Sequence, residues 1–98
     1  TGGGLTENLP RVLPDGLGAD INLDAWDLLD VFKWLADQGG LDQAEMLKTF
    51  NCGIGMVVAI APNKVDAARG AFEGAGYDVY EIGKVAAGEG VRYTGKLL

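Results

Sequence analysis

The spacing of apolar residues along the chain predicts four helices. In three of the four segments apolar residues recur every three or four positions, which is the period of an α-helix with one buried face. In the remaining segment, Asp42 and Glu45 form a capping box, and Leu41 and Met46 occupy the positions of a hydrophobic staple. The first helix is expected to begin near Thr6 or Asn8, because Pro10 cannot lie deep inside a straight helix. The other helices are expected from the N-cap Asp24 to Gly39-Gly40, from the N-cap Asp42 to about Thr49, and from Pro62 to Gly76.

Patterns typical of strands occupy the remaining segments. Residues 19–23 alternate apolar and polar positions, residues 54–61 form a continuous apolar run typical of a central strand, and residues 77–85 indicate a further strand. The last two strands and the helix between them predict a right-handed βαβ crossover. After a turn at 87–90, residues 91–97 alternate again and predict a C-terminal hairpin onto an edge strand. The predicted class is α/β or α+β, with helices packed on a mixed β-sheet.

The composition is that of one small acidic domain. The chain has 98 residues, too few for two complete domains, and a chain of this size is expected to bury about two thirds of its unfolded surface, leaving roughly 5,400 Å² accessible. Fourteen acidic against eight basic side chains give a net charge of −6, so nucleic acid is not an expected partner. The sequence contains no histidine, which excludes nucleophile–histidine pairs and histidine-ligated zinc within the chain.

The sequence favours a cytoplasmic location. Its longest strongly apolar run, residues 54–61, is far too short to cross a bilayer, and the start does not resemble a signal peptide. A single cysteine, Cys52, excludes an internal disulfide. Because the chain opens on Thr1-Gly2-Gly3-Gly4 rather than on methionine, it is expected to be part of a longer protein.

The first candidate site is the run Gly2-Gly3-Gly4 before the first predicted helix. Glycine lets backbone N–H groups approach an oxyanion, and a helix start offers unpaired donors, so this run is able to hold a phosphate. A tight turn that requires small residues explains the same glycines. Thr6 and Asn8 are then either N-caps or ligand contacts, and Arg11 is either a solvated charge or a forked donor to the phosphate.

A second polar corner with glycines lies directly before the apolar run 54–61. It contains Asn51, Gly53 and Gly55. It is not a dinucleotide-binding motif, because a strand follows the glycines and Val58 occupies the third glycine position. Either the glycines permit close packing while Asn51 holds a turn, or Asn51 and free backbone amides face a ligand.

The remaining candidates favour structural roles. Cys52 is interpreted as a small core residue, because no histidine or adjacent basic residue is available to lower the pKa of its thiol. Trp26 and Trp34 are interpreted as packing residues. The aspartates between residues 20 and 37 have the spacing of caps and exposed helix positions rather than of a calcium loop, so no metal site is predicted.

Three stretches of the chain carry a family resemblance. They are T-G-G-G-L-T-E-N-L-P-R at residues 1–11, V-F-K-W-L at 31–35 and E-M-L-K-T-F-N-C-G-I-G-M at 45–56. Together they resemble the C-terminal domain of aminoimidazole ribonucleotide synthetase, also called phosphoribosylformylglycinamidine cyclo-ligase, over essentially the whole chain. Cys52 stands where the family commonly has another apolar residue, and Leu29-Asp30 stands where many members have a proline.

The resemblance implies an ATP-dependent ligase of purine biosynthesis. In this family, formylglycinamidine ribonucleotide and ATP give aminoimidazole ribonucleotide, ADP and phosphate. ATP is proposed to phosphorylate the formyl-amide oxygen, after which the amidine nitrogen closes the imidazole ring. Such a reaction depends on positioning phosphate rather than on a covalent nucleophile.

The resemblance also implies how the site is divided between domains. Residues 1–98 are expected to be one truncated C-terminal domain, with an incomplete sheet edge and no catalysis of its own. The N-terminal domain, absent from this chain, is expected to supply most of the ATP and magnesium site and the main contacts of the homodimer. No catalytic residue is implied, and the residues expected to hold a phosphate at the cleft between the domains are Gly2, Gly3, Gly4, Thr6, Asn8, Arg11, Asn51, Gly53 and Gly55.

Two alternative functions stay open. Selenophosphate synthetase, thiamine monophosphate kinase, hydrogenase maturation factors and formylglycinamidine ribonucleotide synthetase share the architecture and the glycine turn, but not the T-F-N-x-G-I-G-M stretch. A non-catalytic ligand-binding or interaction module is compatible with the same fold. An acidic, magnesium-binding half upstream in the gene would favour either enzyme over the module.

Overall fold

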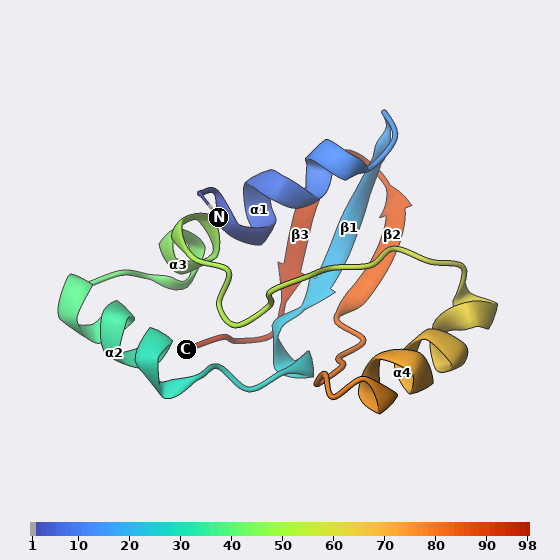
Figure 1. The fold of residues 1–98 in the computed structure, drawn as a ribbon. Coiled ribbons are helices and arrows are strands. Elements are labelled where there is room, and N and C mark those ends of the chain that lie inside the picture. The colour runs from blue at the N-terminus through green and yellow to red at the C-terminus, as the bar shows by residue number, and fades with distance from the viewer. Residues whose placement is uncertain (1) are drawn as a thin grey trace.

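Residues 2–98, which the computed structural model describes, form a β-sheet with helices on one face (Figure 1). The α-helices of this part are α1 (Gly4–Asn8), α2 (Asp30–Gly39), α3 (Gln43–Thr49) and α4 (Val65–Gly74), and the 3₁₀ turns are η1 (Leu9–Val12), η2 (Leu23–Ala25) and η3 (Pro62–Lys64). The strands are β1 (Leu17–Asn22), β2 (Gly83–Ala87) and β3 (Gly90–Thr94). The predicted mixed α+β class is confirmed.

The central strand of the sheet is β1, which pairs antiparallel with β2 and parallel with β3. Ala19 and Ile21 point into the core and are buried, whereas Asp20 between them lies on the other face. The turn after β2 and the strand that follows it are present as predicted. The two strands do not form a hairpin, however, because β1 occupies the space between them.

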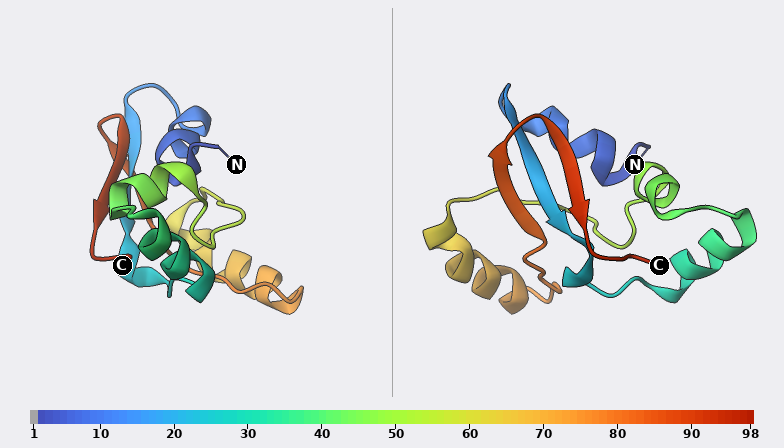
Figure 2. Two further views of the ribbon diagram at one scale, coloured as in Figure 1. Left: turned by 90° about the vertical axis from the view of Figure 1, so that its left-hand side faces the viewer. Right: turned by 180° about the vertical axis from the view of Figure 1, so that it is seen from behind.

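The connection from β2 to β3 crosses over β1 at Gly18 (Figure 2, right). Strands on either side of a third lie about 9.6 Å apart, and the three Cα steps from Ala87 to Gly90 reach at most about 11 Å, so the connection is almost fully extended. A β-carbon at Gly18 would overlap the carbonyl oxygens of Gly88 and Gly90. Glycine is therefore required at residue 18 by the close approach of backbone.

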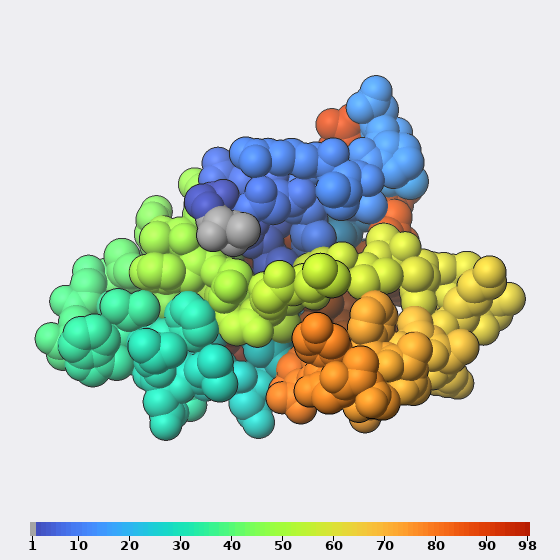
Figure 3. Space-filling view, in the orientation of Figure 1, coloured from blue at the N-terminus to red at the C-terminus, as the bar shows by residue number. Residues whose placement is uncertain are grey.

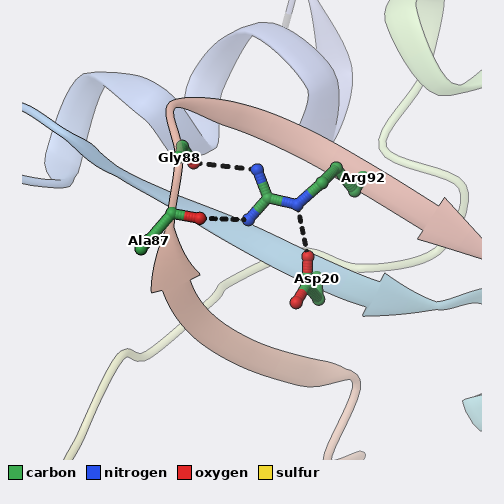
Figure 4. Close-up of polar contacts among 4 residues, drawn as sticks. All are labelled: Asp20, Ala87, Gly88 and Arg92. Carbon is green, nitrogen blue, oxygen red and sulfur yellow. Dashed lines mark hydrogen bonds and ion pairs between the residues drawn. The ribbon is translucent and has the colours of Figure 1, made fainter.

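Arg92 on β3 fastens this connection (Figure 4). Its guanidinium donates to the carboxylate of Asp20 on β1, to the carbonyl oxygen of Gly88 at 2.8 Å and to that of Ala87 at 3.3 Å. One side chain thus joins all the strands of the sheet at the end where the connection crosses. The forked geometry of the guanidinium makes these several bonds possible at once.

The core lies between the inner face of the sheet and the helices (Figure 2, left). Its buried side chains are those of Leu5, Leu9, Ala19, Ile21, Leu23, Trp26, Leu28, Ala36, Met46, Leu47, Cys52 and Leu97. The start of α1 packs directly on the end of α3. A β-carbon at Gly4 would overlap the carbonyl oxygen of Leu47, so the absence of a side chain allows this packing.

Helix α2 begins later than the sequence predicts. The expected N-cap Asp24 instead accepts a hydrogen bond from the amide of Lys96, at 3.1 Å, and α2 starts at Asp30. Trp26 explains the delay. It is buried, and its indole N–H donates to the carbonyl oxygen of Cys52 at 3.0 Å, which holds residue 26 in extended backbone.

The other helix starts agree more closely with the sequence. The carboxylate of Asp42 accepts a hydrogen bond from the amide of Glu45 at 2.9 Å, so the predicted N-cap of α3 is confirmed. Helix α1 begins at Gly4, earlier than the expected Thr6 or Asn8, and continues into the turn η1 that contains the proline. Helix α4 lies within the predicted range.

The predicted central strand at residues 54–61 is not formed. The chain leaves α3 on the helical face of the sheet, away from the free edges of β2 and β3, and β1 already has a neighbour on each side (Figure 1). Residues 55–60 make no backbone hydrogen bond to residues 2–98, and Met56 is 79% exposed. Of the predicted strand 77–85 only the end joins the sheet, so the expected βαβ crossover is absent from the described residues.

This part of the chain is more open than a closed domain of its size. Its accessible surface is 6483 Å², about a fifth above the expected 5,400 Å², so about 57% rather than two thirds of the unfolded surface is buried. Helix α4 contains no fully buried side chain. Trp34 on α2 is 60% exposed, so the prediction that it is a packing residue is wrong. None of the helices within residues 2–98 has the length and hydrophobicity needed to cross a bilayer.

Candidate functional site

The two glycine corners of the sequence meet at one cavity of about 190 Å³. The cavity lies between α1 and η1 on one side and residues 51–57 on the other, and these segments lie side by side in the space-filling view (Figure 3). Four of the predicted site residues line it, although more than 40 positions separate the two pairs in the sequence: Gly4, Asn8, Asn51 and Gly55. The remaining lining residues are Leu5, Leu9, Val12, Ile54, Met56 and Val57.

Asn51 shapes its corner and keeps a donor available. Its side-chain oxygen accepts a hydrogen bond from the amide of Gly53 at 2.8 Å, which closes a turn in which Cys52 and Gly53 both have positive φ, 54° and 92°. Residues 2–98 provide no hydrogen-bond partner for the Asn51 amide Nδ2 or for the backbone amides of Gly55 and Met56. This corner therefore offers several donors beside the cavity.

Asn8 holds the other corner through its side chain. Its Nδ2 donates to the carbonyl oxygens of Gly2, at 3.1 Å, and Gly4, at 2.8 Å, and its Oδ1 accepts from Arg11 at 3.2 Å. The amide is thus used to fix the glycine turn. Arg11 is an exposed cation tied to the same turn, and it does not line the cavity.

The glycines at the start of α1 have a structural explanation in addition to the predicted one. Gly3 and Gly4 have φ values of 95° and 53°, a region that side chains disfavour. Gly4 is buried against the carbonyl groups at the end of α3. Because α1 has only five residues, its dipole adds little to anion binding. Close packing accounts for Gly4, and its contact with a phosphate stays a prediction.

Thr6 points away from the cavity. Its hydroxyl is hydrogen bonded to that of Tyr93 on β3, with the two oxygens 2.8 Å apart. Burial raises the pKa of Tyr93 above its ordinary value, and the bond to Thr6 opposes this shift. Gly53, on the outer side of its turn, faces Leu29 and Phe32. The structure thus brings together four of the predicted residues at the cavity and leaves the others outside its lining. Of these, Gly2 and Gly3 form the glycine turn, and Arg11 is tied to that turn through Asn8.

Cys52 is a core residue, as predicted. It has no exposed surface, and its thiol points toward the carbonyl oxygens of Met46, at 3.5 Å, and Phe50, at 3.8 Å. Burial raises the pKa of the Cys52 thiol from 9.0 to about 11, so the thiolate needed for nucleophilic attack is not formed near neutral pH.

The described residues do not fit a magnesium ion. Within residues 2–98, no three carboxylate, thiol or imidazole side chains come close enough together to hold a metal. Magnesium prefers several oxygen ligands, including carboxylates. No chemical step is therefore assigned to a metal held by this chain.

Sequence reasoning missed two contributions to the site. The first is Trp26, whose bond to Cys52 fixes the Asn51 corner, and which was assigned to packing alone. The second is the apolar wall formed by Val12, Met56 and Val57. The large apolar side chains directly after Gly55 could have indicated this wall. An apolar segment that follows a glycine turn lines any cavity beside that turn.

The described residues form a small α+β fold with a cavity between α1 and residues 51–57. Residues 1–96 match the family described as AIR synthase related protein, C-terminal domain, and the chain belongs to that family. This match confirms the resemblance indicated by the three sequence stretches.

Curated relatives agree with the family match. The chain is 47% identical over 93 residues to the chloroplastic phosphoribosylformylglycinamidine cyclo-ligase of Arabidopsis thaliana. The matched region is 95% of the chain and 24% of the relative. It is 48% identical over 87 residues to the cyclo-ligase of Methylobacillus flagellatus, and the matched region is 89% of the chain and 25% of the relative. It is 49% identical over 85 residues to the bifunctional purine biosynthetic protein purD of Dictyostelium discoideum, covering 87% of the chain and 10% of the relative. The chain thus spans a quarter or less of the length of these relatives.

Proposed function

We propose that this chain is part of a phosphoribosylformylglycinamidine cyclo-ligase and contributes a phosphate-binding wall of its substrate cleft. The intact enzyme converts formylglycinamidine ribonucleotide and ATP to aminoimidazole ribonucleotide, ADP and phosphate. The observation that carries the proposal is the meeting of the two glycine corners at one cavity. Identity of 47–48% to two cyclo-ligases supports the choice of reaction over those of other ATP-using relatives.

The size and lining of the cavity favour one part of a nucleotide substrate. Complete small-molecule sites occupy about 300–1,000 Å³, whereas this cavity has about 190 Å³, which suits a phosphate or a ribose. Asn51 and the neighbouring backbone amides supply N–H donors of the kind that bind phosphate oxygens.

We propose further that ATP, magnesium and the contacts of a homodimer lie mainly in another domain of a cytoplasmic enzyme. The supporting observation is that the chain spans only 24–25% of the two cyclo-ligase relatives. In this division the chain contributes binding and orientation, and the 98 residues alone do not catalyse the reaction. Positioning of reactants is itself a large part of catalysis in phosphoryl transfer.

The test is an Asn51→Asp substitution in the full-length gene product, assayed for ATP-dependent formation of aminoimidazole ribonucleotide. Aspartate retains the oxygen that accepts from Gly53, so the turn is preserved, but it replaces the Nδ2 donor by a negative charge. The expected result is a 10- to 100-fold lower kcat/KM, about the effect of losing one hydrogen bond to a charged group. Asn63→Asp makes the same change at an exposed position away from the cavity and is the matched control.

Two results would contradict the proposal in different ways. Equal kcat/KM values for Asn51→Asp and Asn63→Asp would remove the cavity from the substrate site. Absence of turnover in the well-folded wild-type protein would instead favour another ATP-using relative or a binding module.

A further inference from the structure

Helix α2 presents an aromatic side chain to solvent. Its inner side packs Phe32 and Ala36 against the core, whereas Trp34 and Val31 on other sides of the helix are 60% and 55% exposed. Residues three positions apart on a helix are neighbours, so Val31 and Trp34 form a continuous apolar surface. Tryptophan is one of the residue types enriched among the anchors of protein interfaces.

Carboxylates flank this tryptophan. Asp30 precedes Trp34 by four residues and Asp37 follows it by three, so both lie beside the indole on the helix surface. Neither carboxylate forms an ion pair within residues 2–98, although Lys33 lies three residues after Asp30 and four before Asp37. Asp37 accepts one hydrogen bond, from the side chain of Gln38 at 3.4 Å. The two carboxylates and Lys33 together leave this side of α2 with a net negative charge. We call this surface, formed by Asp30, Val31, Trp34 and Asp37, the Trp34 face.

This combination is complementary to arginine. A guanidinium stacks on an indole ring and at the same time bonds to a carboxylate, and it loses less on dehydration than an ammonium does. A partner that fits the Trp34 face therefore has an exposed arginine next to apolar side chains. The negative charge of the chain, −6 overall, adds attraction to such a surface.

The small size of the Trp34 face identifies the kind of partner. Stable interfaces between separate proteins bury about 800 Å² on each side, several times more than the exposed parts of two or three side chains. A small contact is sufficient when both surfaces belong to one polypeptide, because the linkage raises their effective concentration. The cyclo-ligase relatives are about four times longer than this chain, which covers 24–25% of them.

We propose that the Trp34 face docks on an arginine-bearing apolar surface elsewhere in the same, longer polypeptide. This contact is separate from the candidate ligand cavity, which none of the residues of the Trp34 face lines. It holds α2, and through α2 the sheet domain, in a defined orientation toward that second part of the protein.

The test uses a photo-crosslinking amino acid in place of Gln38 in the full-length gene product. Gln38 is exposed and lies one turn after Trp34. The substitution removes the hydrogen bond of 3.4 Å from Gln38 to Asp37, but it leaves Trp34 and both carboxylates in place. The expected crosslink joins residue 38 to an arginine-containing peptide of the same polypeptide outside these 98 residues. A mixture of isotopically heavy and light protein separates crosslinks within one chain from crosslinks between copies.

Substitutions in this background test the chemistry. Trp34→Ala, or Asp30→Asn combined with Asp37→Asn, is expected to lower the crosslink yield about fivefold, which corresponds to about 1 kcal/mol of lost attraction. Asp66→Asn combined with Asp78→Asn removes the same charge at exposed positions away from α2 and is expected to leave the yield unchanged. A crosslink only between copies, no crosslink, or an equal yield in all variants would overturn the proposal.

Discussion

Substitution of Gly18 by alanine is expected to lower the free energy of unfolding by about 3 kcal/mol. The added β-carbon would overlap the carbonyl oxygens of Gly88 and Gly90 and lie 3.1 Å from the carbonyl carbon of Glu89. All of these atoms belong to backbone, so no side chain can rotate away. Overpacking typically costs 1–3 kcal/mol, and the nearly extended connection between β2 and β3 favours the upper end of that range.

The measurement is urea unfolding of the wild-type and substituted chains, followed by circular dichroism and by tryptophan fluorescence. A loss of about 3 kcal/mol lowers the midpoint of thermal unfolding of a 98-residue chain by roughly 12–24 °C. Gly70→Ala is the control, because Gly70 lies within α4 with nothing within 4 Å of its added β-carbon, and it is expected to stabilise the chain by about 0.5–1 kcal/mol. A Gly18→Ala protein within about 0.5 kcal/mol of the wild type would refute the described path of the connection.

Three further predictions concern single side chains. Arg92→Ala removes the hydrogen bonds to Asp20 and to two carbonyl groups, and urea unfolding should show that the free energy of unfolding falls by about 1 kcal/mol. Arg92→Lys should restore only part of this loss, because an ammonium group lacks the forked donors of a guanidinium. Leu23→Ala, at a fully buried position, should cost about 2–5 kcal/mol in the same assay, whereas Val58→Ala on the exposed apolar segment should cost under about 0.5 kcal/mol, and similar costs would contradict the description of the core. Burial raises the pKa of Cys52 from 9.0 to about 11, so between these pH values the folded protein keeps a proton that the unfolded chain releases. The free energy of unfolding is therefore retained below pH 9 and falls between pH 9 and 11. A Cys52→Ala protein should lose this part of the pH dependence.

Local signals predicted the elements that depend on neighbouring residues. The N-cap Asp42, the alternation of Ala19 and Ile21 and the proline at the start of η3 each act within a few residues, and the structure has a helix, a strand and a helical turn at these positions. The predicted start of α2 was wrong, because the observed start depends on a distant contact, the hydrogen bond from Trp26 to Cys52.

Strand pairing required information that the pattern does not contain. The apolar run 54–61 has the composition of a central strand, but pairing needs a neighbour with unpaired backbone groups, and β1 has none left. The order β2-β1-β3 depends on Gly18, whose lack of a side chain lets another segment cross it. A glycine within a strand signals a close approach without identifying which segment approaches.

The candidate site was predictable as two corners but not as one cavity. Glycine and asparagine marked both turns, because these residues adopt positive φ or close a turn through the side chain. Their meeting depends on the packing of α1 against α3, which Gly4 permits. The direction of Thr6 toward Tyr93 also depends on tertiary structure, and no local pattern predicts it.

The sheet cannot form until residues 83–94 have been synthesised, because β1 pairs only with β2 and β3. β1 ends at residue 22, and its partners occupy residues 83–94, so the 60 residues from 23 to 82 are added between β1 and β2. At about 5–20 residues per second, a ribosome takes roughly 3–12 seconds to add these residues, and both edges of β1 lack their native neighbours throughout. Any chain that stops before residue 83 keeps β1 unpaired, and chaperones and proteases act on such exposed strand edges.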